Sequence, residues 1–196
     1  MHHYFALHKP FGYLSQFKNN KKRKKPLLQE LHNFPEGTMA VGRLDAKSEG
    51  LLLLTTDGKW SNLVRSAQYE KEYWVEVDGK PNSTSLNNLR NGLPISIEGK
   101  EFLTKDCIAE SISSPNLPYI ESVKVRGDQH GPTSWLKIIL REGKFRQVRK
   151  MTAAIGHPTL RLIRVRIGSV HLAPLKAGQC SKIMASAIDQ ELNFAM

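Results

Sequence analysis

Four consecutive leucines, Leu51 to Leu54, constrain the fold of this chain more than any other stretch. A run this apolar is stable only inside a hydrophobic core, and turn residues flank it, so it predicts a buried strand. Asp45 precedes the run closely, in VGRLDAKSEG, and is therefore expected on a short loop at the edge of the core. An aspartate there is either a structural cap of a turn or a working group.

The neighbours of Asp45 favour a working group. Arg43 is close in sequence, and Gly42 and Gly50 border the loop, where glycine permits backbone conformations that other residues resist. A carboxylate beside a guanidinium stays ionised and can be held by two parallel hydrogen bonds. Such a group suits a nucleophile, or a stabiliser of a cationic, sugar-like centre.

The remaining pattern is rich in strands with few helices. Strands are expected in 4–16 (two, around a turn), 38–45, 70–80, 94–99, 100–112, 119–127, 134–140, 159–172 and 177–183. Helices are expected after Asp57, which can cap the first of them and leaves Trp60, Leu63 and Val64 facing inward, and in 82–93 and 145–156. In the strand expected in 70–80, Tyr73, Val75 and Val77 share one face. Gly127 to Pro132 is expected to form a hairpin loop. Because strands and helices do not alternate regularly, we predict an α+β fold on a mixed or antiparallel sheet.

The chain is strongly basic, with a formal net charge of +11 and a pI of about 9.7. This excess favours a polyanionic partner, either nucleic acid or an acidic membrane surface. Six positive residues crowd into 18–25, among them Lys22, Arg23 and Lys24. This segment is either a solvated loop or a contact to phosphates. Arg146, near the start of the helix expected in 145–156, is a second candidate contact to RNA.

Several classes of protein are disfavoured. Two cysteines in 196 residues form no disulfide framework, which indicates a reducing compartment. The sequence has no apolar run long enough for a membrane helix and no signal peptide at its start. Motifs for zinc, nucleotide phosphates or a serine nucleophile are missing. We therefore expect no metal, no cofactor and no membrane.

Four segments, in order, resemble one family. GRLDAKSEGLLLLTTDG (42–58) is similar to the GRLD-x-x-[ST]-x-GLLLLT-x-DG signature of pseudouridine synthases of the RsuA type. HKPFGYLSQF (8–17), KEYWVEV (71–77) and the pair EGKFRQVRKM (142–151) and GHPTLRLIRVRIG (156–168) resemble further segments of that family. Within it, the chain is most similar to the RluE branch, which modifies large-subunit ribosomal RNA.

The resemblance implies the pseudouridine synthase fold: a long mixed sheet in two halves, with flanking helices and a central catalytic cleft. It implies a single catalytic domain over 1–196, with lobes at about 1–66 and 67–196. Because the pattern begins at Tyr4, it also implies that the S4 RNA-binding module of many relatives is missing.

The resemblance also implies a role for individual residues. Asp45 would be the essential catalytic aspartate, and Tyr73 would stack on the flipped base and could remove the C5 proton. Arg149 would pair with the catalytic carboxylate. Arg43 would hold the flipped nucleotide out of the helix, and Leu162 would pack against the base. Lys71, in the same strand as Tyr73, is carried over as a further contact to the substrate.

The implied reaction is the isomerisation of a uridine in RNA, most similar to the reaction on 23S ribosomal RNA. The uridine is flipped out, its N1–C1′ bond breaks, and the base is rejoined through C5. Whether the aspartate attacks C1′, attacks the base or removes a sugar proton stays open. We expect a cytoplasmic monomer whose partner is ribosomal RNA, naked or in an assembling particle. The alternatives are a catalytically silent RNA-binding protein and, on charge alone, a protein of the membrane surface.

Overall fold

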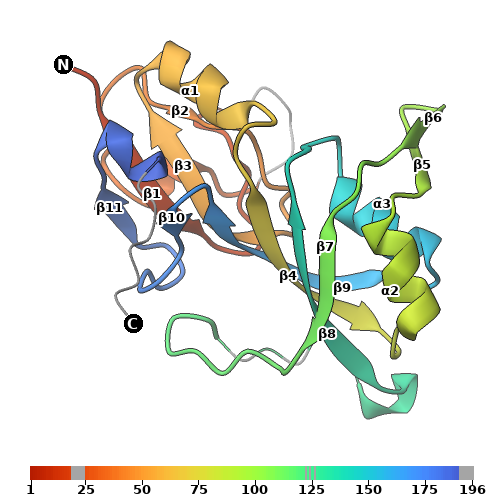
Figure 1. The fold of residues 1–196 in the computed structure, drawn as a ribbon. Helices are drawn as coiled ribbons and strands as arrows, with labels where there is room; N and C mark the ends of the chain where they lie inside the picture. Colours follow the sequence, from red (N-terminus) through yellow and green to blue (C-terminus); the bar gives the residue numbers. More distant parts are fainter. Residues whose placement is uncertain (19–24, 122, 124, 126, 190–196) are drawn as a thin grey trace, which may run out of the picture.

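One mixed sheet organises the chain in the computed structural model, which describes residues 1–18, 25–121, 123, 125 and 127–189 (Figure 1). Within these residues its central path runs β11 (Cys180–Lys182), β1 (Tyr4–Lys9), β3 (Glu49–Thr55), β9 (Thr159–Ile167), β4 (Lys71–Asp78), β8 (Thr133–Leu140) and β7 (Ile108–Ile112). The short strands β2 (Met39–Ala40) and β10 (Val170–His171) pair with β3 and β9. The β3–β9 pair is parallel and the other pairs are antiparallel. The predicted α+β class is confirmed.

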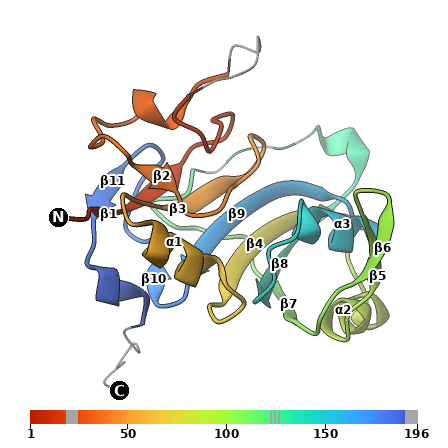
Figure 2. The same cartoon turned by 90° about the horizontal axis from the view of Figure 1, so that it is seen from above.

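Smaller elements cover the sheet and extend it. The helices are α1 (Gly58–Arg65), α2 (Ser83–Arg90) and α3 (Gln147–Ala154), and a hairpin of β5 (Pro94–Ile97) and β6 (Lys100–Leu103) lies beside α3. Single 3-10 turns occupy Leu28–Glu30, Asp128–His130 and Ala185–Ile188. Figure 2 shows α2, α3, β5 and β6 gathered at one end of the sheet and the N-terminal segments at the other.

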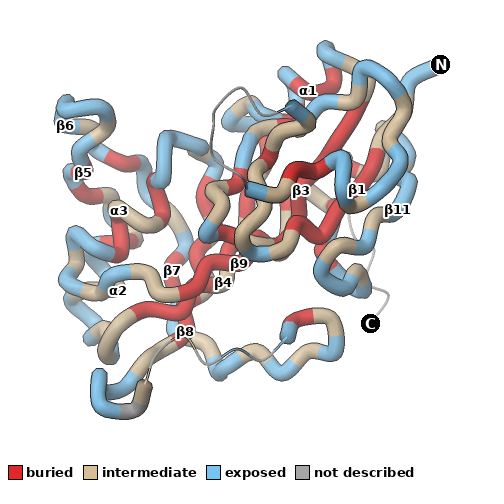
Figure 3. The backbone as a smooth tube through the Cα atoms, turned by 180° about the vertical axis from the view of Figure 1, so that it is seen from behind, coloured by how far each residue is buried: buried red, intermediate tan, exposed pale blue. Residues whose placement is uncertain are grey.

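The predicted buried strand is β3, where all four leucines are fully buried. Alternation sends Leu51 and Leu53 to one face, where they pack in a cluster with α1, and Leu52 and Leu54 to the other. That second face continues into a further cluster, in which α2 and α3 cover β4, β8 and Leu162 of β9. In Figure 3 the buried positions accordingly follow the central strands.

Asp57 begins α1 as predicted, because its carboxylate accepts hydrogen bonds from the backbone N–H groups of Lys59 and Trp60. Trp60 and Val64 are buried as expected. The prediction for Leu63 was wrong, since this side chain is 43% exposed. A helix of eight residues that packs on the face of a sheet buries only a narrow stripe of side chains.

Four predicted strands differ from the observed ones. The strand expected in 100–112 is two strands, β6 and β7, which are separated by 104–107 and belong to different sheets. Of the two strands expected in 4–16, only β1 forms, and Leu14 makes a single bridge to Leu27. The strand expected in 159–172 is broken by a turn at Gly168, where φ is +52° and the chain folds back as β10. The described residues of 119–127 form no strand, because β7 takes the place beside β8 that was expected for them. Consequently 127–132 closes no hairpin and includes a 3-10 turn.

The division into lobes near residue 66 stays a prediction. The single sheet joins strands from both sides of that residue, and β11, near the C-terminus, pairs with β1. None of the helices in the described ranges is long and apolar enough to cross a membrane.

Candidate active site

Asp45 lies on the loop between β2 and β3, and hydrogen bonds fix this loop from two directions. The Ser15 hydroxyl donates to the Leu44 carbonyl (2.8 Å) and accepts from the Leu44 N–H (3.0 Å). The Gly12 N–H donates to the Ala46 carbonyl at 2.7 Å. The backbone on each side of Asp45 is therefore held by the segment that follows β1.

Gly50, the second residue of β3, lies at a close approach of two backbones. Its φ is +103°, and a Cβ atom there would lie 2.3 Å from the Arg164 carbonyl oxygen. Only glycine tolerates both conditions. The parallel pairing of β3 with β9, which brings Arg164 beside the Asp45 loop, thus depends on Gly50.

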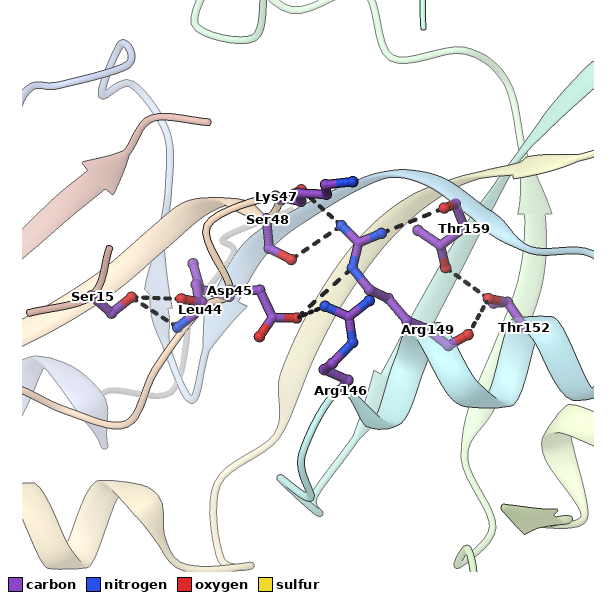
Figure 4. A network of polar contacts seen from close by, with 9 residues as sticks. All are labelled: Ser15, Leu44, Asp45, Lys47, Ser48, Arg146, Arg149, Thr152 and Thr159. Atoms are coloured by element: carbon purple, nitrogen blue, oxygen red, sulfur yellow. Dashed lines mark hydrogen bonds and ion pairs between the residues drawn. The ribbon is translucent and has the colours of Figure 1, made fainter. Parts of the chain in front are cut away.

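Two arginines from the start of α3 approach the Asp45 carboxylate, as Figure 4 shows. Arg146 Nη1 lies 3.2 Å from Asp45 Oδ2 and makes a hydrogen bond to it. Arg149 Nε lies 3.9 Å from the same oxygen, within ion-pair range and too far for a hydrogen bond. The ion pair predicted for Arg149 is present, but Arg146, predicted only as an RNA contact, is the nearer partner.

Arg149 is mainly a cross-link between α3 and the Asp45 loop. Its Nη2 donates to the Lys47 carbonyl at 2.7 Å and to Ser48 Oγ at 3.2 Å, and its Nη1 reaches the Thr159 carbonyl at 3.4 Å. Burial, followed by the charge of Arg146, lowers the pKa of Arg149, and Asp45 acts in the opposite direction. The loop, the helix and β9 are thereby held together around the carboxylate.

A cavity of about 570 Å³ opens at this loop, between the loop, the sheet and the start of α3. Most of the residues predicted for the site line it: Arg43, Asp45, Lys71, Tyr73, Arg146, Arg149 and Leu162. The structure therefore brings together, in one cavity, side chains from four separate segments of the sequence.

Tyr73 and Leu162 supply the apolar wall expected for binding a base. Tyr73 lies opposite Arg164 in the β4–β9 register, and Leu162 lies opposite Val75. Both Tyr73 and Leu162 are buried and belong to the cluster beneath α3. The predicted alternation of β4, with Tyr73, Val75 and Val77 on one face, is confirmed by this cluster.

Two buried lysines flank the cavity without a bonded carboxylate among the described contacts. Lys71 donates to the Ser66 and Arg141 carbonyls, at 2.9 and 3.0 Å. Burial, followed by the charges of Arg164 and Arg141, lowers its pKa to about 8. Lys9 is fully buried, donates to the Pro10 and Tyr13 carbonyls at 2.8 Å, and its pKa falls to about 8 through burial. Lys71 thus joins the end of α1 to the end of β8, and Lys9 holds the turn that follows β1.

Some predicted contacts are not found where the sequence placed them. Among the described residues, the guanidiniums beside Asp45 belong to Arg146 and Arg149 and not to Arg43, which is exposed. Lys22, Arg23 and Lys24 lie outside the described residues.

Two of the three arginines of β9 are held in ion pairs with carboxylates. Arg161 is paired with Glu49 at 2.6 Å. Arg166 is paired with Glu72 and with Glu70, each at 3.0 Å. Their charges are neutralised within the protein, so they add little to the attraction of a polyanion.

Sequence reasoning missed several residues that shape the site: Lys9, Ser15, Ser48 and the role of Arg164 in the cavity wall. Arg164 Nε donates to the Leu51 carbonyl at 2.8 Å. Leu51 directly follows Glu49 and Gly50, the two residues of β3 that pair with β9. Lys9 and Ser15 lie in HKPFGYLSQF, one of the segments that resembled the family, so a signal for them was present.

The chemistry available in the cavity is that of a fixed carboxylate. Two guanidiniums keep Asp45 oriented, Tyr73 offers an aromatic face and a hydroxyl, and Leu162 offers an apolar surface. A planar base could lie between the aromatic and aliphatic side chains while its sugar meets the carboxylate. This arrangement suits chemistry at an anomeric carbon or on a pyrimidine ring.

Comparisons with known proteins agree with this geometry. Residues 3–154 match the model of the RNA pseudouridylate synthase family. The chain is 39% identical over 175 residues to ribosomal large subunit pseudouridine synthase E of Xanthomonas campestris, with 88% of this chain and 91% of that protein covered. The corresponding protein of Vibrio parahaemolyticus is also 39% identical, with 89% and 71% covered.

A solved structure agrees as well. A crystal structure of a pseudouridylate synthase superimposes with a TM-score of 0.76 at 26% identity, covering 96% of this chain and 73% of that one. The fold, the cavity and the family match thus lead to one conclusion: this chain belongs to the RNA pseudouridylate synthase family.

Proposed function

We propose that this chain converts a uridine of large-subunit ribosomal RNA into pseudouridine, with Asp45 as the essential catalytic group. The observation that carries the proposal is the Asp45 carboxylate in the wall of the cavity, held by Arg146 and Arg149 beside Tyr73. The ribosomal target rests on relatives that are 39% identical and named for the large subunit.

The reaction balances without an oxidant or an energy source. The N1–C1′ bond breaks, the base turns, and a C5–C1′ bond forms. The proton on C5 leaves and N1 gains a proton, so the product is an isomer of the substrate. We assign the removal of the C5 proton to Tyr73. Asp45 acts by attack on C1′, by attack on the base or by removal of a sugar proton.

The remaining side chains of the cavity hold the flipped nucleotide. A base inside a duplex cannot reach a carboxylate in a cavity wall, so the uridine must leave its stack. Tyr73 and Leu162 receive the base between them, and Arg43, exposed at the cavity, holds the flipped nucleotide out of the helix. Arg146, partly exposed, adds positive charge toward the phosphates, and Lys71 contributes to the substrate site as part of the cavity wall.

The test is tritium release from transcripts labelled at uridine C5. We expect release from large-subunit ribosomal RNA and none from small-subunit ribosomal RNA or transfer RNA. Release from only small-subunit ribosomal RNA or only transfer RNA would show that the target does not lie in the large subunit. Tight binding without release from any RNA would favour a silent RNA-binding protein. Comparing naked RNA with assembling particles identifies which of the two is the substrate.

The setting of this activity is also part of the proposal. We infer a cytoplasmic protein, because ribosomal RNA is its substrate, and a monomer, because one copy supplies every residue of the cavity described above. Light scattering on the purified protein, alone and with RNA, tests the monomer.

A further inference from the structure

Phe145 is an exposed aromatic residue at the edge of the candidate active site. Its side chain is 61% exposed, and it immediately precedes Arg146, which is bonded to Asp45. Among the described residues it belongs to none of the three buried clusters. Phe145 therefore contributes little to the core, and its position beside the cavity needs another explanation.

A lysine fixes the position of this ring. Lys150 Nζ lies 5.5 Å from the centroid of Phe145, within the range of a cation–π contact. The same Nζ donates to the Ser96 carbonyl in β5, so the ammonium is anchored to the hairpin. Lys150 lies over one face of the ring, and because Phe145 is 61% exposed, we infer that the other face is available to a flat partner.

A second pair of the same kind lies next to it. Lys144 Nζ is 5.0 Å from the centroid of Phe102 in β6, and both residues line the cavity. We call these four residues, Phe102, Lys144, Phe145 and Lys150, the aromatic ledge. The ledge joins the cavity to the β5–β6 hairpin, where the residues of β6 are largely exposed (Figure 3).

The surroundings of the ledge are positive. Arg141 and Arg146 line the cavity beside it, paired with Glu70 and Asp45. Lys105 and Lys144 also line it and, like Lys150, form no ion pair among the described residues, so these three lysines supply the positive charge. A basic surface with interspersed aromatic rings is the pattern that binds single-stranded nucleic acid. The cations meet phosphates, and each ring stacks on a base whatever its identity.

We propose that the aromatic ledge binds the nucleotide next to the target uridine, with the base of that nucleotide stacked on the free face of Phe145. This inference rests on the proposed function and adds a determinant of substrate choice to it. When a uridine flips out, its neighbour loses a stacking partner, and an aromatic ring can replace that partner. The ledge would then favour uridines whose neighbour is unpaired.

The test is a double-mutant cycle between protein and RNA. The RNA is the shortest large-subunit ribosomal RNA fragment that the wild type binds specifically, prepared intact and with single abasic sites at the positions that flank each of its uridines. The proteins are the wild type, Phe145→Ala and Phe145→Trp. Leu63→Ala is the matched control, because Leu63 is also an exposed apolar residue, 43% exposed, and does not line the cavity.

We expect Phe145→Ala to weaken binding of the intact RNA about tenfold, since stacking of one base contributes roughly that much. KM should rise by more than kcat falls, Phe145→Trp should restore binding, and Leu63→Ala should bind like the wild type. On RNA that is abasic at the contacted position, the wild type and Phe145→Ala should bind equally. If Phe145→Ala weakens binding by the same factor on every abasic RNA as on the intact RNA, the proposal is wrong.

Equilibrium binding is measured beside turnover in this experiment. An RNA that is bound but not modified therefore still tests the ledge. Absence of turnover in the wild type would refute the proposed function alone, and absence of coupling between Phe145 and any flanking base would refute the ledge alone.

Discussion

Arg146 Nη1 lies 3.2 Å from Asp45 Oδ2, although the backbone of Arg146 is left-handed, with φ at 54°. This conformation is unfavourable for a residue with a side chain, by about 1–2 kcal/mol. Glycine would adopt it freely, so the arginine side chain must have a function that outweighs the energetic cost of its backbone conformation. Strained backbone of this kind is concentrated at functional sites.

We predict that Arg146→Gly separates stability from activity. The substitution relieves the left-handed backbone and removes a partly exposed ion pair, and such a pair contributes only about 0–1 kcal/mol. The free energy of unfolding should therefore stay within about 1 kcal/mol of the wild type, while tritium release falls because Asp45 loses its nearer partner.

Arg149→Met should behave differently from Arg146→Gly. The Lys47 carbonyl and Ser48 Oγ lose their hydrogen-bond donor, which should lower the free energy of unfolding by about 1–3 kcal/mol. Urea unfolding measured beside turnover distinguishes the two, and equal destabilisation by both variants would contradict the contrast.

Ser15→Ala should loosen the Asp45 loop. The buried N–H and C=O of Leu44 would each lose a partner, so we expect a loss of about 1–3 kcal/mol in the free energy of unfolding. Because Asp45 directly follows Leu44, kcat should fall more than RNA binding. Ser61→Ala is the matched control, since Ser61 is equally buried, on α1, and does not line the cavity. A Ser15→Ala variant with normal kcat would show that the loop is held by other contacts.

The buried Lys71 predicts a specific dependence of stability on pH. Its pKa is about 8 in the folded protein, against an ordinary value of 10.5. Between these two values the unfolded chain binds more protons than the folded one, so this group makes the protein more stable as pH rises from about 8 to 10.5. The difference in unfolding free energy between the wild type and Lys71→Met should therefore shift in favour of the wild type over that interval. Lys9, with the same shifted pKa, is present in both proteins and cancels in the difference. A difference that does not change with pH would contradict the assignment.

The basic segment 18–25 should contribute to RNA binding through counterion release. A triple variant that combines Lys22→Gln, Arg23→Gln and Lys24→Gln should bind RNA more weakly and with a flatter salt dependence. Each lost contact to a phosphate reduces the slope of log K against log salt by about 0.7–0.9. The control neutralises three lysines that are exposed and do not line the cavity: Lys59, Lys176 and Lys182. An unchanged slope in the first triple variant would leave this segment without a role in binding.

Local patterns in the sequence predicted much of this structure. The leucine run, the cap at Asp57 and the alternation of β4 depend on neighbouring residues, and each was correctly expected. The gathering of Asp45, Tyr73 and Arg149 in one cavity was expected only through the resemblance to a family.

Other features depend on long-range pairing, which no local pattern specifies. The parallel β3–β9 pair brings Arg164 to the cavity, and β7 takes the place beside β8 that was expected for 119–127. The choice between Arg146 and Arg149 as the nearer partner of Asp45 depends on the left-handed residue before α3. An alternation of apolar and polar residues, as in 119–127, predicts that a strand can form and not which partner it finds.

The most direct test of the central claim compares the wild type with Asp45→Asn on large-subunit ribosomal RNA labelled with tritium at uridine C5. Asparagine keeps the shape of the side chain and removes its charge, so the fold and RNA binding should be largely retained. We predict that the wild type releases tritium and that Asp45→Asn releases none while binding the RNA with similar affinity. Release by Asp45→Asn at the rate of the wild type, or a loss of binding equal to the loss of turnover, would contradict a catalytic role for Asp45.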